Sequence, residues 1–282
     1  MSKNTILNVI GLKETQGLFG VEIEAEGHNL PTSLKPYWRV DDDPSLKAGF
    51  EGREYVMPKP SSLEGVREAL NFLDRAYIDN ETTVEETITS GVHVHVNVQD
   101  MTPKELFTFI TTYFILEELL VTYCGPSREG NHFCLRAKDA EWIIHELIEV
   151  AINRKLKRLD TDTLRYCSLN VYSLFKYGSI EFRAMRGTRD LDAIYEWVEI
   201  LARVREASLE FKQPSDVLSS MSYNGEEVFV RRILGDKADF FLRNPHLERM
   251  VREGARIVQP LAYAVDWGTY KDTNNNPFAK AI

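Results

Sequence analysis

Three stretches of the chain alternate strictly between apolar and polar residues, which is the pattern of a β-strand with one buried face. The stretches are residues 19–27, 91–99 and 178–184. Their polar positions carry side chains that bind metal ions or anions: Glu22, Glu24 and Glu26, then His93, His95, Asn97 and Gln99, then Glu181 and Arg183. Alone, the acidic row fits a solvated edge strand equally well. Its repetition in three strands favours a single sheet with one polar, functional face and a helix-covered back.

Weaker strand patterns extend this sheet. We expect strands within residues 37–46 and 51–58, each running into a proline, and a short polar strand at 82–89. Glu54 lies in the second of these and adds a carboxylate to the polar face. Residues 164–175 and 178–184 are expected to form a hairpin that turns at Tyr177 and Gly178.

Helical periodicity and capping signals predict the remaining elements. Ser61 and Glu64 have the spacing of a capping box for a helix to about residue 77, and Thr102, Pro103 and Glu105 begin another that runs to about residue 123. This second helix is apolar nearly all round, so we expect it at the centre of the molecule. Further helices are expected at residues 139–153, 190–212, 215–221, 225–234 after an Asn224 cap, and 245–265, followed by an irregular tail at 271–282.

Composition narrows the choice of class and partner. A chain of 282 residues with 43% hydrophobic content can bury a large core, and we expect one catalytic domain whose helical part follows residue 187. The net charge of −9 argues against a nucleic-acid partner, because phosphate binding needs a basic face. Three cysteines without CxxC spacing fit a reducing cytoplasm. We see no signal peptide, and the apolar segment 106–124 contains Glu117 and Glu118, which favours a buried helix over a membrane span.

The polar face has the composition of a magnesium or manganese site. Carboxylates with one imidazole suit Mg²⁺ or Mn²⁺ better than a structural zinc ion. Asp41, Asp42 and Asp43 follow a predicted strand and either cap the local backbone or join this face. The sequence contains neither glycine-rich phosphate loop of the common nucleotide folds, so metal ions and arginines would have to hold a nucleotide. Arg165 and Arg183 are the candidates, although Arg183 could instead form an ion pair with Glu181.

These motifs together resemble the amidoligase branch of the carboxylate-amine ligases, the superfamily of glutamine synthetase and glutamate-cysteine ligase. They appear in the family's order: Phe19–Glu24 (Gly-x-Glu-x-Glu), Val40–Leu46, Gly52–Pro58, Gly91–Asn97 (Gly-x-His-x-His), Arg165–Asn170 and Ile180–Arg183 (Glu-Phe-Arg). The resemblance implies an α+β fold with a curved, mostly antiparallel sheet like the half-barrel of glutamine synthetase, and helices on its convex face. Members of this branch occur in bacteriophages, bacteria and fungi, and a bacteriophage member is our expectation.

The resemblance also implies two divalent metal ions, Mg²⁺ or Mn²⁺, and ATP. Glu22, His93 and Glu181 would bind the ion nearer the nucleotide. Glu24 and Glu54 would bind the ion nearer the acceptor carboxylate. Both groups of ligands lie on the polar face of the predicted sheet.

Four further residues take roles in catalysis or nucleotide binding by the same resemblance. Arg183 and Arg165 would hold the transferring phosphate, while His95 and Asn97 would line the site. The family's aspartate-glycine-serine turn reads Asp-Asp-Pro-Ser here, so Asp42 and Asp43 are both candidates to face the site, and we count Asp43 as catalytic. The glycine-containing loop 125–132 is a candidate mobile flap over the site.

The implied reaction is an ATP-dependent ligation. A substrate carboxylate attacks the γ-phosphate to give an acyl phosphate, and an amine then displaces phosphate to form an amide or isopeptide bond. The substrates would be small molecules or peptides, and the sequence leaves the oligomeric state open. Two alternatives stay open: a metal-dependent hydrolase or oxygenase built on the His-x-His strand, with histidines from His132, His145 or His246, and an inactive ligase fold that only binds.

Overall fold

Strands between residues 19 and 186 pair into one sheet in the order β2-β3-β1-β5-β7-β6, with β4 paired to the far end of β1. The ladders between these strands are all antiparallel. The computed structural model describes residues 4–46, 49–161 and 165–270. Its strands are β1 (Phe19–His28), β2 (Arg39–Asp41), β3 (Glu51–Val56), β4 (Thr83–Glu85), β5 (Gly91–Asn97), β6 (Leu169–Asn170) and β7 (Ser179–Arg186).

Helices make up most of the remaining described chain. The α-helices are α1 (Ile6–Ile10), α2 (Leu63–Asp79), α3 (Pro103–Cys124), α4 (Trp142–Asn153), α5 (Ser173–Tyr177), α6 (Leu191–Ser208), α7 (Pro214–Asn224), α8 (Glu226–Leu234), α9 (Ala238–Leu242) and α10 (Leu247–Ala262). Short 3-10 turns lie at Pro126–Arg128, Leu156–Leu159 and Gly235–Lys237. This combination of an open antiparallel sheet with packed helices confirms the α+β prediction.

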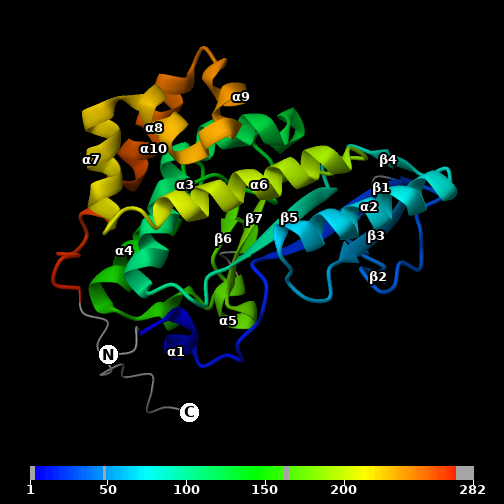
Figure 1. Ribbon diagram of the computed structural model, residues 1–282, viewed down its shortest axis with the longest axis horizontal. Coiled ribbons are helices and arrows are strands. Elements are labelled where there is room, and N and C mark those ends of the chain that lie inside the picture. Colours follow the sequence, from blue (N-terminus) through cyan, green and yellow to red (C-terminus); the bar gives the residue numbers. More distant parts are fainter. Residues whose placement is uncertain (1–3, 47–48, 162–164, 271–282) are drawn as a thin grey trace.

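Helices α2, α3 and α6 cover one face of the sheet (Figure 1). The apolar residues of the strands point toward them, and Val92, Val94 and Val96 are completely buried. On β7, the ring centroid of Phe182 lies 4.8 Å from that of Tyr113 on α3. Because alternate residues of the central strands make this contact, the polar residues between them project from the opposite face.

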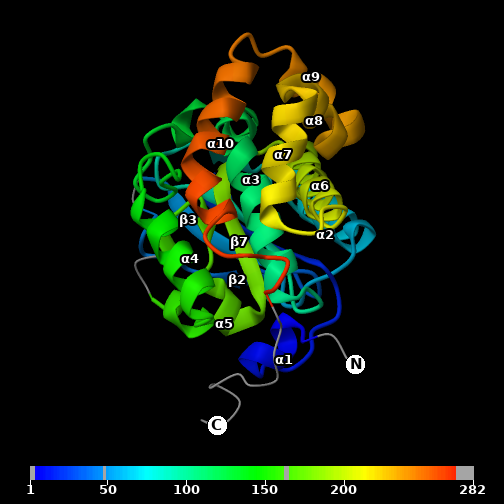
Figure 2. The same ribbon diagram turned by 90° about the vertical axis from the view of Figure 1, so that its left-hand side faces the viewer.

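Helix α3 is buried on every side, as its all-round apolar sequence predicted. It begins at the predicted capping box, in which the Glu105 main-chain N–H donates to the Thr102 hydroxyl at 3.2 Å and the Thr102 N–H donates to the Glu105 carboxylate at 2.7 Å. Helix α10 lies against α3 (Figure 2). Among the described helices, α3 is the one long and apolar enough to cross a membrane, but 89% of its apolar window is buried inside the protein.

Several predicted boundaries are wrong for local reasons. Ser62, not Ser61, caps α2 by accepting from the Gly65 N–H, because the main chain of Ser61 is held extended by hydrogen bonds to Phe19. Asn224 does not cap α8: it is the last residue of α7. The strand predicted at residues 164–175 is much shorter, since only β6 is a strand and α5 forms the connection to β7. Helix α9 was not predicted. The predicted tail 271–282 lies outside the described residues.

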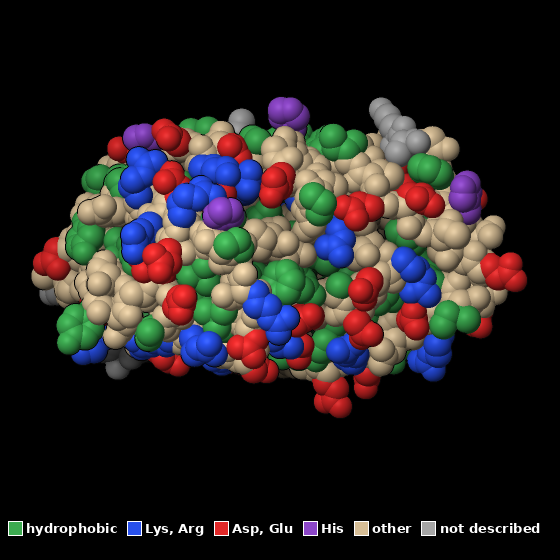
Figure 3. Space-filling model, turned by 90° about the horizontal axis from the view of Figure 1, so that it is seen from above, with side chains coloured by type: hydrophobic (Ala, Val, Ile, Leu, Met, Phe, Trp, Pro, Cys, Tyr) green, Lys and Arg blue, Asp and Glu red, His purple; other side chains and the backbone are tan. Residues whose placement is uncertain are grey.

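The helical side of the molecule carries both signs of charge, with a gathering of Lys and Arg over one end (Figure 3). A hollow of about 650 Å³ lies where α9 leads into α10. Four arginines and three glutamates line it: Arg243, Arg249, Arg252 and Arg256, with Glu227, Glu248 and Glu253. These charges largely offset one another, as in the ion pair between Arg256 and Glu253 at 2.7 Å.

Candidate active site

The strand register brings the predicted ligands together on the polar face. Glu22 on β1 lies opposite His93 on β5, and Glu24 lies opposite Glu54 on β3. On the other side of β5, His95 lies opposite Glu181 on β7. Directly opposed residues in an antiparallel pair have Cβ atoms about 4.5–5.5 Å apart, so their side chains converge. The predicted metal ligands therefore form one continuous acidic surface across four strands.

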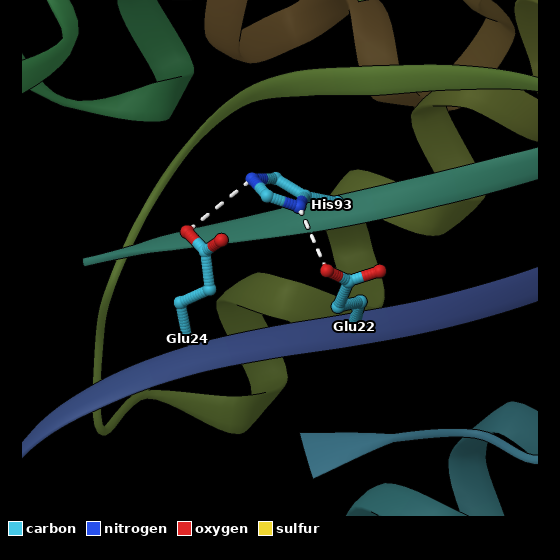
Figure 4. Close-up of side chains that lie close together, drawn as sticks. All are labelled: Glu22, Glu24 and His93. Carbon is cyan, nitrogen blue, oxygen red and sulfur yellow. Dashed lines mark ion pairs between the residues drawn. The ribbon is translucent and has the colours of Figure 1, made fainter. Parts of the chain in front are cut away.

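His93 is the centre of the first group of ligands. Its Nδ1 lies 3.4 Å from Glu22 Oε1 and 3.5 Å from Glu181 Oε1, while its Nε2 lies 3.4 Å from Glu24 Oε2. Figure 4 shows the imidazole between the carboxylates of Glu22 and Glu24. The ring is only 1% exposed, so it is held in place by packing as well as by these contacts. Glu22, Glu24 and His93 offer ligand atoms within 4.8 Å of one another.

A second group adjoins the first and shares Glu24 with it. Glu24, Asp43 and Glu54 also offer oxygens within 4.8 Å of one another. Asp42 points elsewhere, because its mostly exposed carboxylate pairs with Arg53 at 2.9 Å. Asp43 is therefore the aspartate that faces the site. It also caps its own turn by accepting from the Ser45 N–H at 2.7 Å, so the local capping interpretation holds as well.

The carboxyl groups are close enough to perturb one another's protonation. Burial alone would raise the pKa of Glu22, but hydrogen bonds from His93 and His95 outweigh it and hold that pKa well below the ordinary value. The hydrogen bond to Glu22, reinforced by burial, raises the pKa of Glu54 to about 9. Burial also raises the pKa of Glu24. Without a cation, then, Glu54 keeps its proton at neutral pH and shares it with Glu22.

Arg183 borders the first group of ligands on β7. Its Nη1 lies 2.5 Å from Glu181 Oε1 and 3.3 Å from His93 Nδ1. The ion pair with Glu181, considered as the alternative to a phosphate role, is therefore present. Glu181 in turn accepts a hydrogen bond from the side-chain amide of Asn170 at 2.7 Å. Burial would raise the pKa of Glu181, but His95, Arg183 and His93 together lower it, so the carboxylate stays ionised.

A cavity of about 460 Å³ opens beside Glu22 and His95. Its walls combine apolar side chains, among them Leu12, Met57 and Pro58, with the ring of Tyr177. Four cations also line it: Lys13, Arg39, Lys59 and Lys176. The cavity therefore offers an apolar surface next to positive charges, at the edge of the acidic face.

Comparison with known proteins identifies the family of the chain. The family model described as "Putative amidoligase enzyme" matches residues 41–205, more than half of the chain. The chain belongs to the amidoligase family. Membership indicates an enzyme of the ligase type and confirms the resemblance drawn from the motifs. No curated protein matches the chain.

The matched region of the amidoligase contains Asp43 and Glu54 of the second group and the β5 and β7 ligands, while β1, which carries Glu22 and Glu24, precedes it. Neither ligand group includes His132, His145 or His246, the histidines that a zinc hydrolase or an oxygenase would draw on. Oxygen donors dominate both groups, which is the donor set of Mg²⁺ or Mn²⁺.

Two residues predicted to line the nucleotide site differ in what they do. His95 borders the cavity, and its Nδ1 lies 3.1 Å from the Ser179 hydroxyl oxygen. Asn97 also borders it, but its amide donates to the carbonyl oxygens of Thr15 and Gly17 at 3.1 and 3.0 Å. In this amidoligase, Asn97 therefore anchors the N-terminal segment that forms one wall of the cavity.

Arg165 is exposed just after residues 162–164, which the structure does not describe. Its guanidinium carbon lies 5.1 Å from the ring centroid of Tyr166. Its phosphate role stays a prediction. The loop 125–132 is anchored at Asn131, whose amide donates to the Ile88 carbonyl at 2.9 Å. Movement of this loop as a flap also stays a prediction.

Sequence reasoning missed the four cations of the cavity. Lys13, Lys59 and Lys176 come from three separate segments, and none of them belongs to a spacing pattern that signals phosphate binding. Arg39 stood inside a predicted strand, two residues before Asp41, and its exposed guanidinium pairs with that carboxylate at 2.5 Å. The one available signal was the Pro58-Lys59-Pro60 sequence at a strand end, where a lysine is held in an extended backbone.

Proposed function

We propose that this amidoligase is an ATP-dependent carboxylate-amine ligase that forms an amide or isopeptide bond through an acyl phosphate. The observation that carries the proposal is the pair of adjoining acidic groups joined at Glu24, next to a cavity lined by cations. A single metal ion would not need a second set of acids. A polyphosphate and a carboxylate brought together need compensation at two places, because both are anionic.

The residues present fit divalent metal ions. Their carboxyl groups converge so closely that the hydrogen bond to Glu22 and burial raise the pKa of Glu54 to about 9, and a bound cation would take the place of the proton that Glu54 holds. Glu22 and His93, with Glu24 shared and Glu181 beside them, would hold the ion on the cavity side, and Glu24 and Glu54 the ion on the acceptor side, with Asp43 at its edge. When bound, such ions neutralise the phosphate oxygens and orient the carboxylate for attack.

The protein's own groups account for binding and positioning. The apolar wall and Tyr177 ring of the cavity suit a nucleotide base, and Lys13, Lys59 and Lys176 can reach its phosphates. Arg183, held beside Glu181 and His93, is placed to neutralise the transferring phosphoryl group. Half-buried Asp43, at the acceptor side, is the candidate to take up the proton that the amine loses.

The proposed reaction has two steps. In the first, a carboxylate oxygen of the substrate forms a bond to the γ-phosphorus of ATP and the bond to the β-phosphate oxygen breaks, which releases ADP. In the second, the amine nitrogen attacks the acyl carbon, inorganic phosphate leaves, and the nitrogen gives up one proton. The carboxylate and amine would be small molecules or peptides. Three buried free cysteines fit a reducing compartment, for which we propose the cytoplasm.

Calorimetry tests the nucleotide and metal requirement directly. A non-hydrolysable ATP analogue should bind only when Mg²⁺ or Mn²⁺ is present, and Glu22→Gln and Glu181→Gln should abolish this binding. Glu68→Gln, an exposed glutamate on α2, is the matched control and should bind as the unaltered protein does. Tight zinc or iron binding with no response to the ATP analogue would reject the ligase in favour of another metalloenzyme.

A mass-spectrometric screen tests the reaction itself. The protein with ATP and Mg²⁺ is offered mixtures of amino acids and peptides, and a product lighter by one water than the sum of its substrates should appear together with ADP. Nucleotide binding without any ADP-coupled product would favour an inactive ligase fold that acts as a binding protein.

A further inference from the structure

Arg128 is a buried cation beside the polar face of the sheet, next to Gly91 and near Glu24. It lies in the 3-10 turn after α3, and it is 2% exposed. Its Nη1 donates to the Ser90 carbonyl oxygen at 3.0 Å, and its Nη2 donates to the Arg183 carbonyl oxygen at 2.8 Å. One guanidinium therefore joins the residue before β5 to the middle of β7.

The carbonyl of Arg183 needs such a partner because the sheet is irregular there. Val92 pairs with Met185 and Val94 pairs with Phe182, so the single residue His93 lies opposite both Arg183 and Ala184. This is a β-bulge, in which the extra residue is left out of the ladder. The N–H of Arg183 turns to the Ser168 carbonyl oxygen at 2.8 Å, and its carbonyl turns to Arg128. Both main-chain groups of Arg183 are thus fixed from outside the β5–β7 ladder.

The charge of Arg128 has no direct counter-ion. Within the described chain, no carboxylate lies at ion-pair distance from its guanidinium, and its Nε has no hydrogen-bond partner. Buried charges without a partner are costly, so residues of this kind persist where they hold something in place. The guanidinium lies over Gly91: a Cβ at that position would make ordinary contacts of 3.4 Å with both Nη atoms and 3.5 Å with Glu24 Oε2.

We propose that Arg128 is a positioning residue that holds the β7 bulge and thereby aims the Arg183 side chain into the active site. The planar guanidinium is required because two carbonyl oxygens, on different strands, must be bound at once. A lysine keeps the charge but cannot span both acceptors in a fixed geometry. The kinetic part of this inference rests on the proposed ligase function, whereas the structural part does not.

Arg128→Lys tests the kinetic part. Misplacing a catalytic group by about an ångström lowers turnover by up to about a hundredfold, so kcat should fall roughly ten- to a hundredfold while the KM for ATP stays unchanged. In the Arg183→Lys background, Arg128→Lys should lower kcat almost no further, because Arg128 acts through the Arg183 guanidinium and that group is already absent. Arg136→Lys is the matched control, since Arg136 lies on the same connection but pairs with Glu118 at 3.3 Å.

Two structural readouts work even if no ligase activity is found. In the arginine NMR spectrum, the Arg183 Nε–H signal should shift in Arg128→Lys and stay in place in Arg136→Lys. In the unaltered protein, a guanidinium held by two carbonyls should show hindered rotation and slow exchange with water. The proposal would be overturned by additive losses of kcat in the double variant, by an unmoved Arg183 signal in Arg128→Lys, or by rapid proton exchange with water at every arginine. The exchange measurement uses the unaltered protein, so it does not depend on any variant folding.

Discussion

Glu117, buried in the centre of the molecule, should make the stability of the protein depend on pH. It lies on α3 with 2% of its surface exposed, and its carboxyl group accepts from the Ser168 hydroxyl and from the Ala137 N–H at 2.7 Å. Burial raises its pKa from 4.5 to about 7, against the opposing effect of those two hydrogen bonds. The folded protein therefore keeps this proton at pH values where the unfolded chain has released it.

The size of the effect follows from the shift. The protonated carboxyl gives its full stability below pH 4.5, and that stability is lost as the pH rises toward 7. Since one pKa unit corresponds to about 1.4 kcal/mol, the loss over the whole window is about 3 kcal/mol. Glu117→Gln has no proton to lose, and its amide can still accept from Ala137 and donate to Ser168. Its stability advantage over the unaltered protein should grow by roughly 2–3 kcal/mol between pH 5 and pH 8.

Urea unfolding followed by circular dichroism at several pH values measures this difference. Glu68→Gln on the exposed side of α2 serves as the control, and its stability should follow that of the unaltered protein at every pH. If the Glu117→Gln and unaltered curves run parallel from pH 5 to pH 8, Glu117 is ionised in the folded protein, and the reasoning from its burial is wrong.

Three further predictions concern other parts of the molecule. Gly254→Ala places a Cβ 2.4 Å from the Ile115 carbonyl oxygen, so α10 must move away from α3. The free energy of unfolding, measured with urea, should therefore fall by about 1–3 kcal/mol, and an unchanged unfolding midpoint would contradict this. Thr102→Ala removes the α3 capping box and should cost about 1 kcal/mol, whereas Thr102→Ser should cost much less. Mn²⁺ should displace the proton that Glu54 shares with Glu22, so the affinity of the protein for Mn²⁺ should rise until the pH reaches about 9. Calorimetry in buffers of different ionisation enthalpy measures the released proton. An affinity for Mn²⁺ that does not depend on pH would refute the shared proton.

The central strands could be predicted because alternation is a direct consequence of strand geometry. Val92 and Val94 flank His93 in the sequence, and in an antiparallel sheet such neighbours must point to opposite faces. The same rule placed Glu22 and Glu24 on the polar face without knowledge of their partners. The capping box of α3 was equally readable, because its two hydrogen bonds join residues three positions apart.

Features that depend on distant residues could not be predicted. Arg128 binds carbonyl groups that lie 38 and 55 residues away, so the sequence around it shows only a glycine-containing loop. The β7 bulge depends on how β5 and β7 align, and the sequence of neither strand alone indicates it. The choice between Asp42 and Asp43 was decided by Arg53, a residue of the neighbouring strand that draws Asp42 outward.

The wall of the cavity that precedes β1 has a consequence for how this protein is handled. Asn97, the last residue of β5, binds the carbonyls of Thr15 and Gly17. Gln99, two residues after β5, binds the N–H of Thr15 and the carbonyl of Lys13, so these two side-chain amides secure a segment that has no ladder of its own. A chain shortened by its first seventeen residues would keep every acid of the site and yet lose one side of the cavity. The truncated protein should still bind Mn²⁺ but should bind adenine nucleotides weakly. One truncation therefore distinguishes the contribution of the acidic metal ligands from that of the cavity.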